Sequence, residues 1–161
     1  MHRQKRMRPH RLARVPCPCL VAWHVLLISG CGSDLPEVAP VRGVVEFDGK
    51  PLSGFQHAAV AFTPKAGRPA KGVVSPENGM FELTTYSPGD GARIGRHAVA
   101  VSATVDDLTA KIENKYPAVR FVIPEKFADR DASGLVYDVK PEGNVIRIQI
   151  RSDGTGAIVA E

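Results

Sequence analysis

Apolar and polar residues alternate along several short segments of this chain, and turns containing glycine and proline separate those segments. Alternation with a period of two places successive side chains on opposite faces of a β-strand, so each segment has one face that can be buried. The turns recur at intervals of roughly 8–15 residues, which is typical of sandwiches and barrels. The pattern therefore predicts an all-β domain.

The alternation predicts seven strands in a domain that spans residues 41–151. Their ranges are 41–47, 58–63, 71–75, 80–86, 96–104, 135–139 and 146–150. Asp48-Gly49 and Asn78-Gly79 supply tight turns between neighbouring strands, because these residues tolerate positive φ. With one apolar face per sheet, we expect two antiparallel sheets stacked about 10 Å apart, a seven-stranded Ig-like β-sandwich.

Residues 105–132 interrupt this alternation. Apolar residues spaced by four between Asp106 and Tyr116 permit a single short helix. A long connection within a compact domain is commonly functional or mobile. A helix, a mobile segment and a binding loop remain three alternatives for this part of the chain.

The first 30 residues differ from the rest in charge. They contain six Lys and Arg and no acidic residue. The whole chain has a formal net charge of +4, but residues 31–161 contain 15 bases and 17 acids and are therefore slightly acidic. All three cysteines also lie within the first 31 residues, which excludes disulfide scaffolds and thiolate zinc sites from the remainder. The predicted domain is slightly acidic and its aromatic residues occupy core positions, so we expect no nucleic-acid partner.

The N-terminal segment has the arrangement of an export signal. Basic residues up to Arg14 precede an apolar stretch that ends at Ile28, and Ser29-Gly30-Cys31 follows. The apolar stretch is about half the length of roughly twenty residues that a membrane-spanning helix requires. Ile28-Ser29-Gly30-Cys31 resembles the bacterial lipobox, whose cysteine receives a diacylglyceryl group before cleavage. We therefore expect a signal peptide over residues 1–30.

The same resemblance implies that Cys31 is lipidated, for example with palmitate, and is the first residue of the mature chain. Two or more acyl chains anchor a protein stably in a membrane. Residues 31–40 then form a tether that reaches at most about 35 Å, and residues 152–161 form a C-terminal tail. The protein would be exported and face the periplasm or the cell surface, in either membrane. The alternative is an ordinary signal peptide with Cys31 as a free thiol.

Several blocks of the domain resemble the carboxypeptidase regulatory-like, transthyretin-like β-sandwich, in particular the small lipoproteins of planctomycete-like bacteria. These blocks are Val41–Gly54, Val60–Pro64, Asn78–Leu83, Thr84–Ala92, Gly95–Val101 and Lys126–Leu135. The resemblance implies an accessory domain without catalysis. The chain lacks the C-terminal Tyr-Arg-Gly-Ser motif of transthyretin-related hydrolases, and His97 stands where that family usually has an aromatic residue.

Beyond residue 31 the chain contains two histidines, and we expect neither to be catalytic. His97 shares a strand face with Val99 and Val101, which predicts a packed side chain, whereas His57 lies beside a turn and should be solvated. No Gly-x-Ser-x-Gly motif accompanies them. No cofactor is expected, and a small envelope hydrolase that uses His97 is the alternative.

Asp129-Arg-Asp-Ala-Ser133-Gly begins like a calcium-binding EF-hand loop, but its twelfth position is Lys140 instead of a bidentate glutamate. Asp129 and Ser133 are more simply explained as caps of a turn through local hydrogen bonds. The alternative is a weak calcium site completed by Asp106 or Asp107. No metal site is therefore assigned.

The remaining motifs concern partners. Ser87–Gly91 is rich in glycine but precedes no helix, so we expect a wide hairpin loop instead of a phosphate-binding loop. A protein or glycan partner in the envelope would be engaged through loops or a sheet edge. Trp23, the single tryptophan, lies in the signal segment, so a sugar site built on tryptophan is unavailable and a protein partner is favoured.

Overall fold

A computed structural model describes residues 35–107 and 118–161 of the protein. The chain divides into two compact units, Met1–Asp34 and Leu35–Glu161, and only the second contains described residues. The predicted signal peptide, Cys31 and most of the possible helix between Asp106 and Tyr116 lie outside the described residues.

The described residues form an all-β unit. Twelve strands and one short 3-10 helix follow one another as β1 (Val38–Ala39), β2 (Val41–Phe47), β3 (Lys50–Pro51), β4 (His57–Pro64), β5 (Ala70–Val73), β6 (Met80–Glu82), β7 (Ala92–Arg93), β8 (Gly95–Asp107), β9 (Ala118–Phe121), η1 (Glu125–Ala128), β10 (Leu135–Val139), β11 (Asn144–Ile150) and β12 (Gly156–Ala160). No α-helix is present in this part of the chain.

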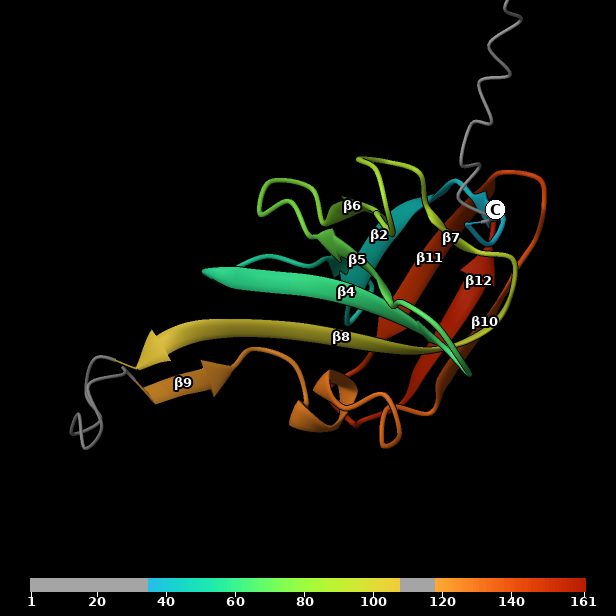
Figure 1. Ribbon diagram of the computed structural model, residues 1–161. Helices are drawn as coiled ribbons and strands as arrows, with labels where there is room; N and C mark the ends of the chain where they lie inside the picture. The colour runs from blue at the N-terminus through green and yellow to red at the C-terminus, as the bar shows by residue number, and fades with distance from the viewer. Residues whose placement is uncertain (1–34, 108–117) are drawn as a thin grey trace, which may run out of the picture. The chain divides into compact units, whose positions relative to one another are not determined.

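The strands form two five-stranded sheets and one small pair (Figure 1). The β8 sheet has the order β10-β8-β4-β5, with β9 paired to the end of β8. The β2 sheet has the order β12-β11-β2-β3, and β6 also pairs with β2. Strands β1 and β7 pair with each other. In Figure 1, β4 and β8 cross the view in front of the more steeply inclined β11 and β12.

One strand pair differs from the expected antiparallel arrangement. Strands β2 and β11 are parallel, with Val41 opposite Asn144 and Phe47 opposite Ile150, so the β2 sheet is mixed. The prediction of purely antiparallel sheets was therefore wrong at this pair. Alternation identifies the buried face of a strand but not its direction, and no hairpin joins these two strands to impose one.

Each of the seven predicted segments overlaps one strand, but the described residues contain five further short strands that the alternation did not predict. These are β1, β3, β7, β9 and β12. Strand β12 lies in residues 152–161, which were expected to be a tail, and it pairs with β11 along its whole length. Its side chains are mostly exposed, so its sequence lacks the alternation of apolar and polar residues that would predict a strand. Strand β1 likewise lies within the expected tether, and Ala39 is buried there.

Inward-facing side chains of both sheets form a single hydrophobic cluster. Val60, Phe62, Val101, Ile146 and Ile148 are completely buried in it. Burying a side chain of this size stabilises the folded state by roughly 1.5–3 kcal/mol. These buried positions follow the same alternation that predicted the strands, and the outward positions of the longer strands are half-buried or exposed.

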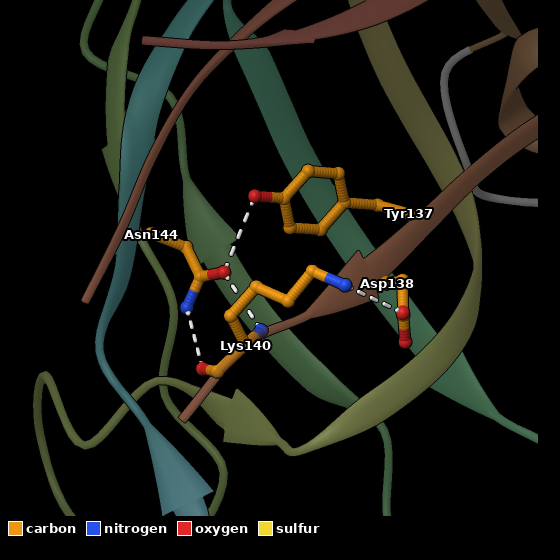
Figure 2. Close-up of polar contacts among 4 residues, drawn as sticks. All are labelled: Tyr137, Asp138, Lys140 and Asn144. Atoms are coloured by element: carbon orange, nitrogen blue, oxygen red, sulfur yellow. Dashed lines mark hydrogen bonds and ion pairs between the residues drawn. The ribbon is translucent and has the colours of Figure 1, made fainter. Parts of the chain in front are cut away.

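Asn144 connects three parts of this unit through its side chain. Its Oδ1 accepts hydrogen bonds from the Tyr137 hydroxyl at 3.2 Å and the Lys140 backbone N–H at 2.9 Å, as Figure 2 shows. Its Nδ2 donates to the backbone carbonyls of Pro40, Lys140 and Glu142. The side chain therefore joins the turn between β10 and β11 to the start of β2. Burial raises the pKa of Tyr137, which favours the neutral hydroxyl that donates this bond.

The segment Ser87–Gly91 is a loop organised by Asp90, but the predicted hairpin was wrong, because the flanking strands β6 and β7 pair with β2 and β1 and not with each other. The Asp90 carboxylate accepts backbone N–H bonds from Thr85 at 2.7 Å and from Tyr86 and Ser87 at 2.8 Å. Burial opposes its ionisation, but these N–H bonds outweigh burial and hold the pKa of Asp90 below its usual value. The loop is therefore fastened by an ionised side chain.

Candidate functional site

The outward face of the β8 sheet is lined by unusually small side chains. Its two central strands present Ala59, Ala61, Thr63, Ala98, Ala100 and Ser102, because the residues between them point into the core. The register pairs Ala61 with Ala100 and Ala59 with Ser102. We call this surface of six residues the alanine face. With no long side chain on β4 or β8 over this stretch, the backbone of the sheet lies close to the surface.

A hollow of about 370 Å³ lies at one end of the alanine face. Its lining contains Thr63, Pro64, Lys65, Arg96, Ala98, Arg130 and Asp131. Lys65 follows the end of β4, Arg96 is the second residue of β8, and Arg130 lies in the turn before β10. The three bases face one acid, so we call this feature the cationic hollow.

The two acids closest to the cationic hollow, Asp131 in its lining and Asp138 beside Arg96, neutralise little of the charge of its three bases. Asp138 is the register partner of Arg96, but its carboxylate instead binds the Lys140 ammonium at 2.9 Å (Figure 2). This hydrogen bond is the main cause of the raised pKa of Lys140. Asp131 lies 3.5 Å from Arg130. Among the described residues, neither Lys65 nor Arg96 has an acidic group within 4.0 Å.

A second hollow of about 370 Å³ lies at the opposite end of the alanine face. Its lining is Phe55, Gln56, His57, Ala58, Ala59, Val73, Val74, Pro76, Ser102 and Thr104. Val73 is 81% exposed although it is aliphatic. We call this feature the apolar hollow. A hydrophobic side chain of a partner could be accommodated here, because burying such exposed apolar surface is favourable.

The structure confirms the predicted positions of both histidines. His57 is exposed at the edge of the apolar hollow. His97 is only 1% exposed, its Nε2 lies 2.7 Å from the Arg93 carbonyl, and its ring packs beside Phe62. Nδ1 of His97 has no hydrogen-bond partner in the described part of the chain. An imidazole buried in this way is not presented to a substrate.

Asp129 and Ser133 cap the turn before β10, as the sequence predicted. Asp129 accepts a hydrogen bond from the Asp131 N–H at 2.7 Å, and Ser133 Oγ accepts one from the Leu135 N–H at 3.1 Å. The Ser133 hydroxyl also donates to the Val99 carbonyl. No group of three His, Cys, Asp or Glu residues with the spacing of a metal site occurs in residues 35–107 and 118–161.

Sequence reasoning did not identify either hollow. The bases of the cationic hollow come from three segments that are far apart in the chain, so only the strand pairing brings them together. The alternation of small residues along Ala98–Ser102 was visible, but nothing in it distinguished a binding face from a plain solvent-exposed one.

Comparison of the chain with protein-family models, with curated proteins and with solved structures finds no match. Within the described residues, no helix has the length and apolar character needed to cross a membrane. The functional assignment therefore depends on the surface described above and on the sequence motifs.

Proposed function

We propose that this protein is a non-catalytic, lipid-anchored protein of the cell envelope whose β-domain is a binding module. The observation that carries the proposal is the alanine face, an open sheet surface with a hollow at each end. The fold is proposed to be a β-sandwich of the carboxypeptidase regulatory-like, transthyretin-like type. Two five-stranded sheets with a common core support this assignment, and so do the sequence blocks that resemble the family.

The lipid anchor is proposed at Cys31, on the strength of the lipobox-like sequence and the basic and apolar regions before it. Its test is metabolic labelling with palmitate together with membrane fractionation. Cys31→Ser should abolish labelling and release the protein from membranes, whereas the control Cys19→Ser should leave both unchanged. A Cys31→Ser protein that is still labelled with palmitate would disprove the anchor.

The partner is proposed to be an envelope protein that covers the alanine face. A surface of small side chains beside an exposed apolar hollow suits a protein partner, and the lack of tryptophan beyond Trp23 disfavours sugar stacking. A photo-crosslinking residue at position 61 should capture one specific partner in intact envelopes. The matched control is position 157 in β12, which is exposed on the other sheet. Equal capture from both positions would argue against this face.

The absence of catalysis is supported by the burial of His97. We expect purified protein to hydrolyse neither ester nor amide substrates. Hydrolysis that disappears in His97→Phe, with the folded structure retained by circular dichroism, would instead support the alternative of a small envelope hydrolase.

A further inference from the structure

The cationic hollow has a charge opposite to that of the domain around it. The described residues contain 13 Lys and Arg against 15 Asp and Glu, whereas the hollow combines three bases with one acid. The only acid in the lining is engaged by Arg130, and the register partner of Arg96 is engaged by Lys140. The side chains of Lys65 and Arg96 are therefore available to an external anion.

The composition of the hollow suits a phosphate group. Two guanidinium groups offer planar forks of N–H donors that match phosphate oxygens, and the Lys65 ammonium adds a third positive centre. Thr63, whose hydroxyl is a further donor, and the small Ala98 form part of the same lining. A volume of about 370 Å³ accommodates a headgroup and leaves space for water.

The N-terminal end of the described unit is held next to residues that adjoin the hollow in the chain. The Ile94 N–H donates to the Glu37 carbonyl at 3.2 Å, only two residues before Arg96. Arg93, which pairs with Val38, also donates to the carbonyl of Ala66, the residue after Lys65. Glu37 is six positions after Cys31, and such a segment reaches at most about 20 Å. A lipid at Cys31 would keep the hollow close to the headgroup layer.

We propose that the cationic hollow binds the headgroup phosphate of an anionic phospholipid in the membrane that holds the anchor. The choice of membrane phosphate over a soluble one depends on the proposed lipidation of Cys31. Binding by Lys65, Arg96 and Arg130 would orient the domain, so that the alanine face meets its partner at a defined angle to the membrane. The anchor at Cys31 and the phosphate in the hollow would then fix the orientation of the domain at two points.

The test uses the processed chain, residues 31–161, with Cys31→Ser so that no acyl chain contributes to binding. All described strands lie within this length. Partitioning is measured at low salt onto vesicles of phosphatidylcholine, with and without phosphatidylglycerol. We expect binding only when phosphatidylglycerol is present, and weaker binding at 0.1 M salt, where the Debye length falls to about 10 Å.

The decisive comparison is between two triple variants of equal charge. Lys65→Gln/Arg96→Gln/Arg130→Gln should weaken partitioning by about five-fold for each base removed, the contribution expected of a base near an anionic surface. Arg42→Gln/Lys50→Gln/Arg151→Gln removes three exposed bases elsewhere and should change partitioning by less than about two-fold. Both variants should retain the circular dichroism spectrum of the parent protein.

Three results would overturn the proposal. Equal weakening in the two triple variants would indicate diffuse attraction without a site, and no partitioning onto phosphatidylglycerol would remove the lipid altogether. Titration with inorganic phosphate, followed by NMR at Arg96 and Lys65, identifies the source of the anion. Binding of free phosphate without binding of vesicles would assign the hollow to a soluble ligand. The Cys31→Ser test protein carries no lipid. Failure of the phosphate-binding proposal is therefore distinguishable from failure of the lipid anchor, which palmitate labelling tests.

Discussion

The outward faces of the two sheets differ in how their polar groups are satisfied. On the β2 sheet, Arg147 of β11 binds Glu46 of β2 at 3.2 Å and also binds Glu161 beyond β12. Gln149 donates to the same Glu46 carboxylate. On the β8 sheet the alanine face carries only alanine, serine and threonine, and two bases of the adjoining hollow have no acidic partner among the described residues.

This difference shows that burial alone does not determine what a sheet is used for. Both sheets have five strands and an apolar inner face, yet one outer face carries a network of ion pairs centred on Arg147 and the other is lined by small side chains. Long charged side chains that bind one another leave little surface for a partner, whereas small side chains leave the sheet accessible. We therefore expect mutations on the β2 sheet to change stability and mutations around the β8 sheet to change binding.

The largest effect on stability is expected for Asn144→Ala at the start of β11. The change leaves the Tyr137 hydroxyl and the Lys140 backbone N–H without their common acceptor in a partly buried site. Each buried polar group left unsatisfied costs about 1–3 kcal/mol, so the free energy of unfolding should fall by about 2–4 kcal/mol. Urea denaturation at neutral pH measures this loss.

Tyr137→Phe is the matched control, because it removes only the 3.2 Å bond to Asn144 and keeps the ring that packs on Phe62. Its cost should be about 1 kcal/mol. If Asn144→Ala lowers the free energy of unfolding no more than Tyr137→Phe does, then the Asn144 amide does not stabilise the turn between β10 and β11 or its connection to the start of β2.

The next effect concerns the loop that follows β6 of the β2 sheet. Asp90→Asn exchanges a charged acceptor of three N–H groups for an amide with a single acceptor oxygen, and should cost about 1–2 kcal/mol at pH 7. The pKa of Asp90 is lowered from 3.8 in the folded state. The stabilisation is therefore present above pH 3.8 and is lost as pH falls through the lower, folded-state pKa.

Urea midpoints of the parent protein and Asp90→Asn, measured at pH 7 and near pH 2, test this pH dependence. The difference between the two proteins should narrow at the acidic pH. A difference that stays constant would show that the charge of Asp90 contributes nothing and that only the shape of the side chain matters.

The strands of both sheets were predictable because burial imposes a period of two on the sequence. Alternation placed His97 on one strand face with Val99 and Val101 and predicted a packed side chain, and all three residues are buried. Strand β12 was not predictable in this way, because it is an edge strand whose side chains are mostly exposed. Its pairing depends on backbone hydrogen bonds to β11, which leave no mark in the sequence.

The candidate site was less predictable than the fold. Lys65, Arg96 and Arg130 come together only through the pairing of β8 with β4 and with β10. The lack of an acidic partner for Arg96 depends further on a local event, the ion pair between Asp138 and Lys140. Local sequence patterns cannot reveal a charge left unpaired in this way, because it results from competition between side chains across strands.

Lys140 and Arg96 compete for the Asp138 carboxylate, and a substitution at Lys140 can change the outcome. Lys140→Gln frees Asp138, whose backbone is paired with Arg96, to neutralise the guanidinium. Partitioning onto phosphatidylglycerol vesicles should weaken by up to about five-fold, as expected for one effective base near the surface. Lys140→Arg preserves the ion pair with Asp138 and should bind like the parent. Identical binding by both variants would mean that Asp138 does not control Arg96.

The smallest effect is expected from Arg147→Gln on the outward face of the β2 sheet. Arg147 binds two carboxylates, and these bonds raise its pKa, chiefly through the hydrogen bond to Glu161. Its side chain is 41% exposed, however, and solvent screens exposed ion pairs strongly. We expect a small fall in melting temperature that disappears in high salt, with no change in vesicle partitioning or in crosslinking from position 61. A change in either binding measurement would show that the two outer faces are coupled. A change in stability alone would show that the outer face of the β2 sheet contributes to stability and not to binding.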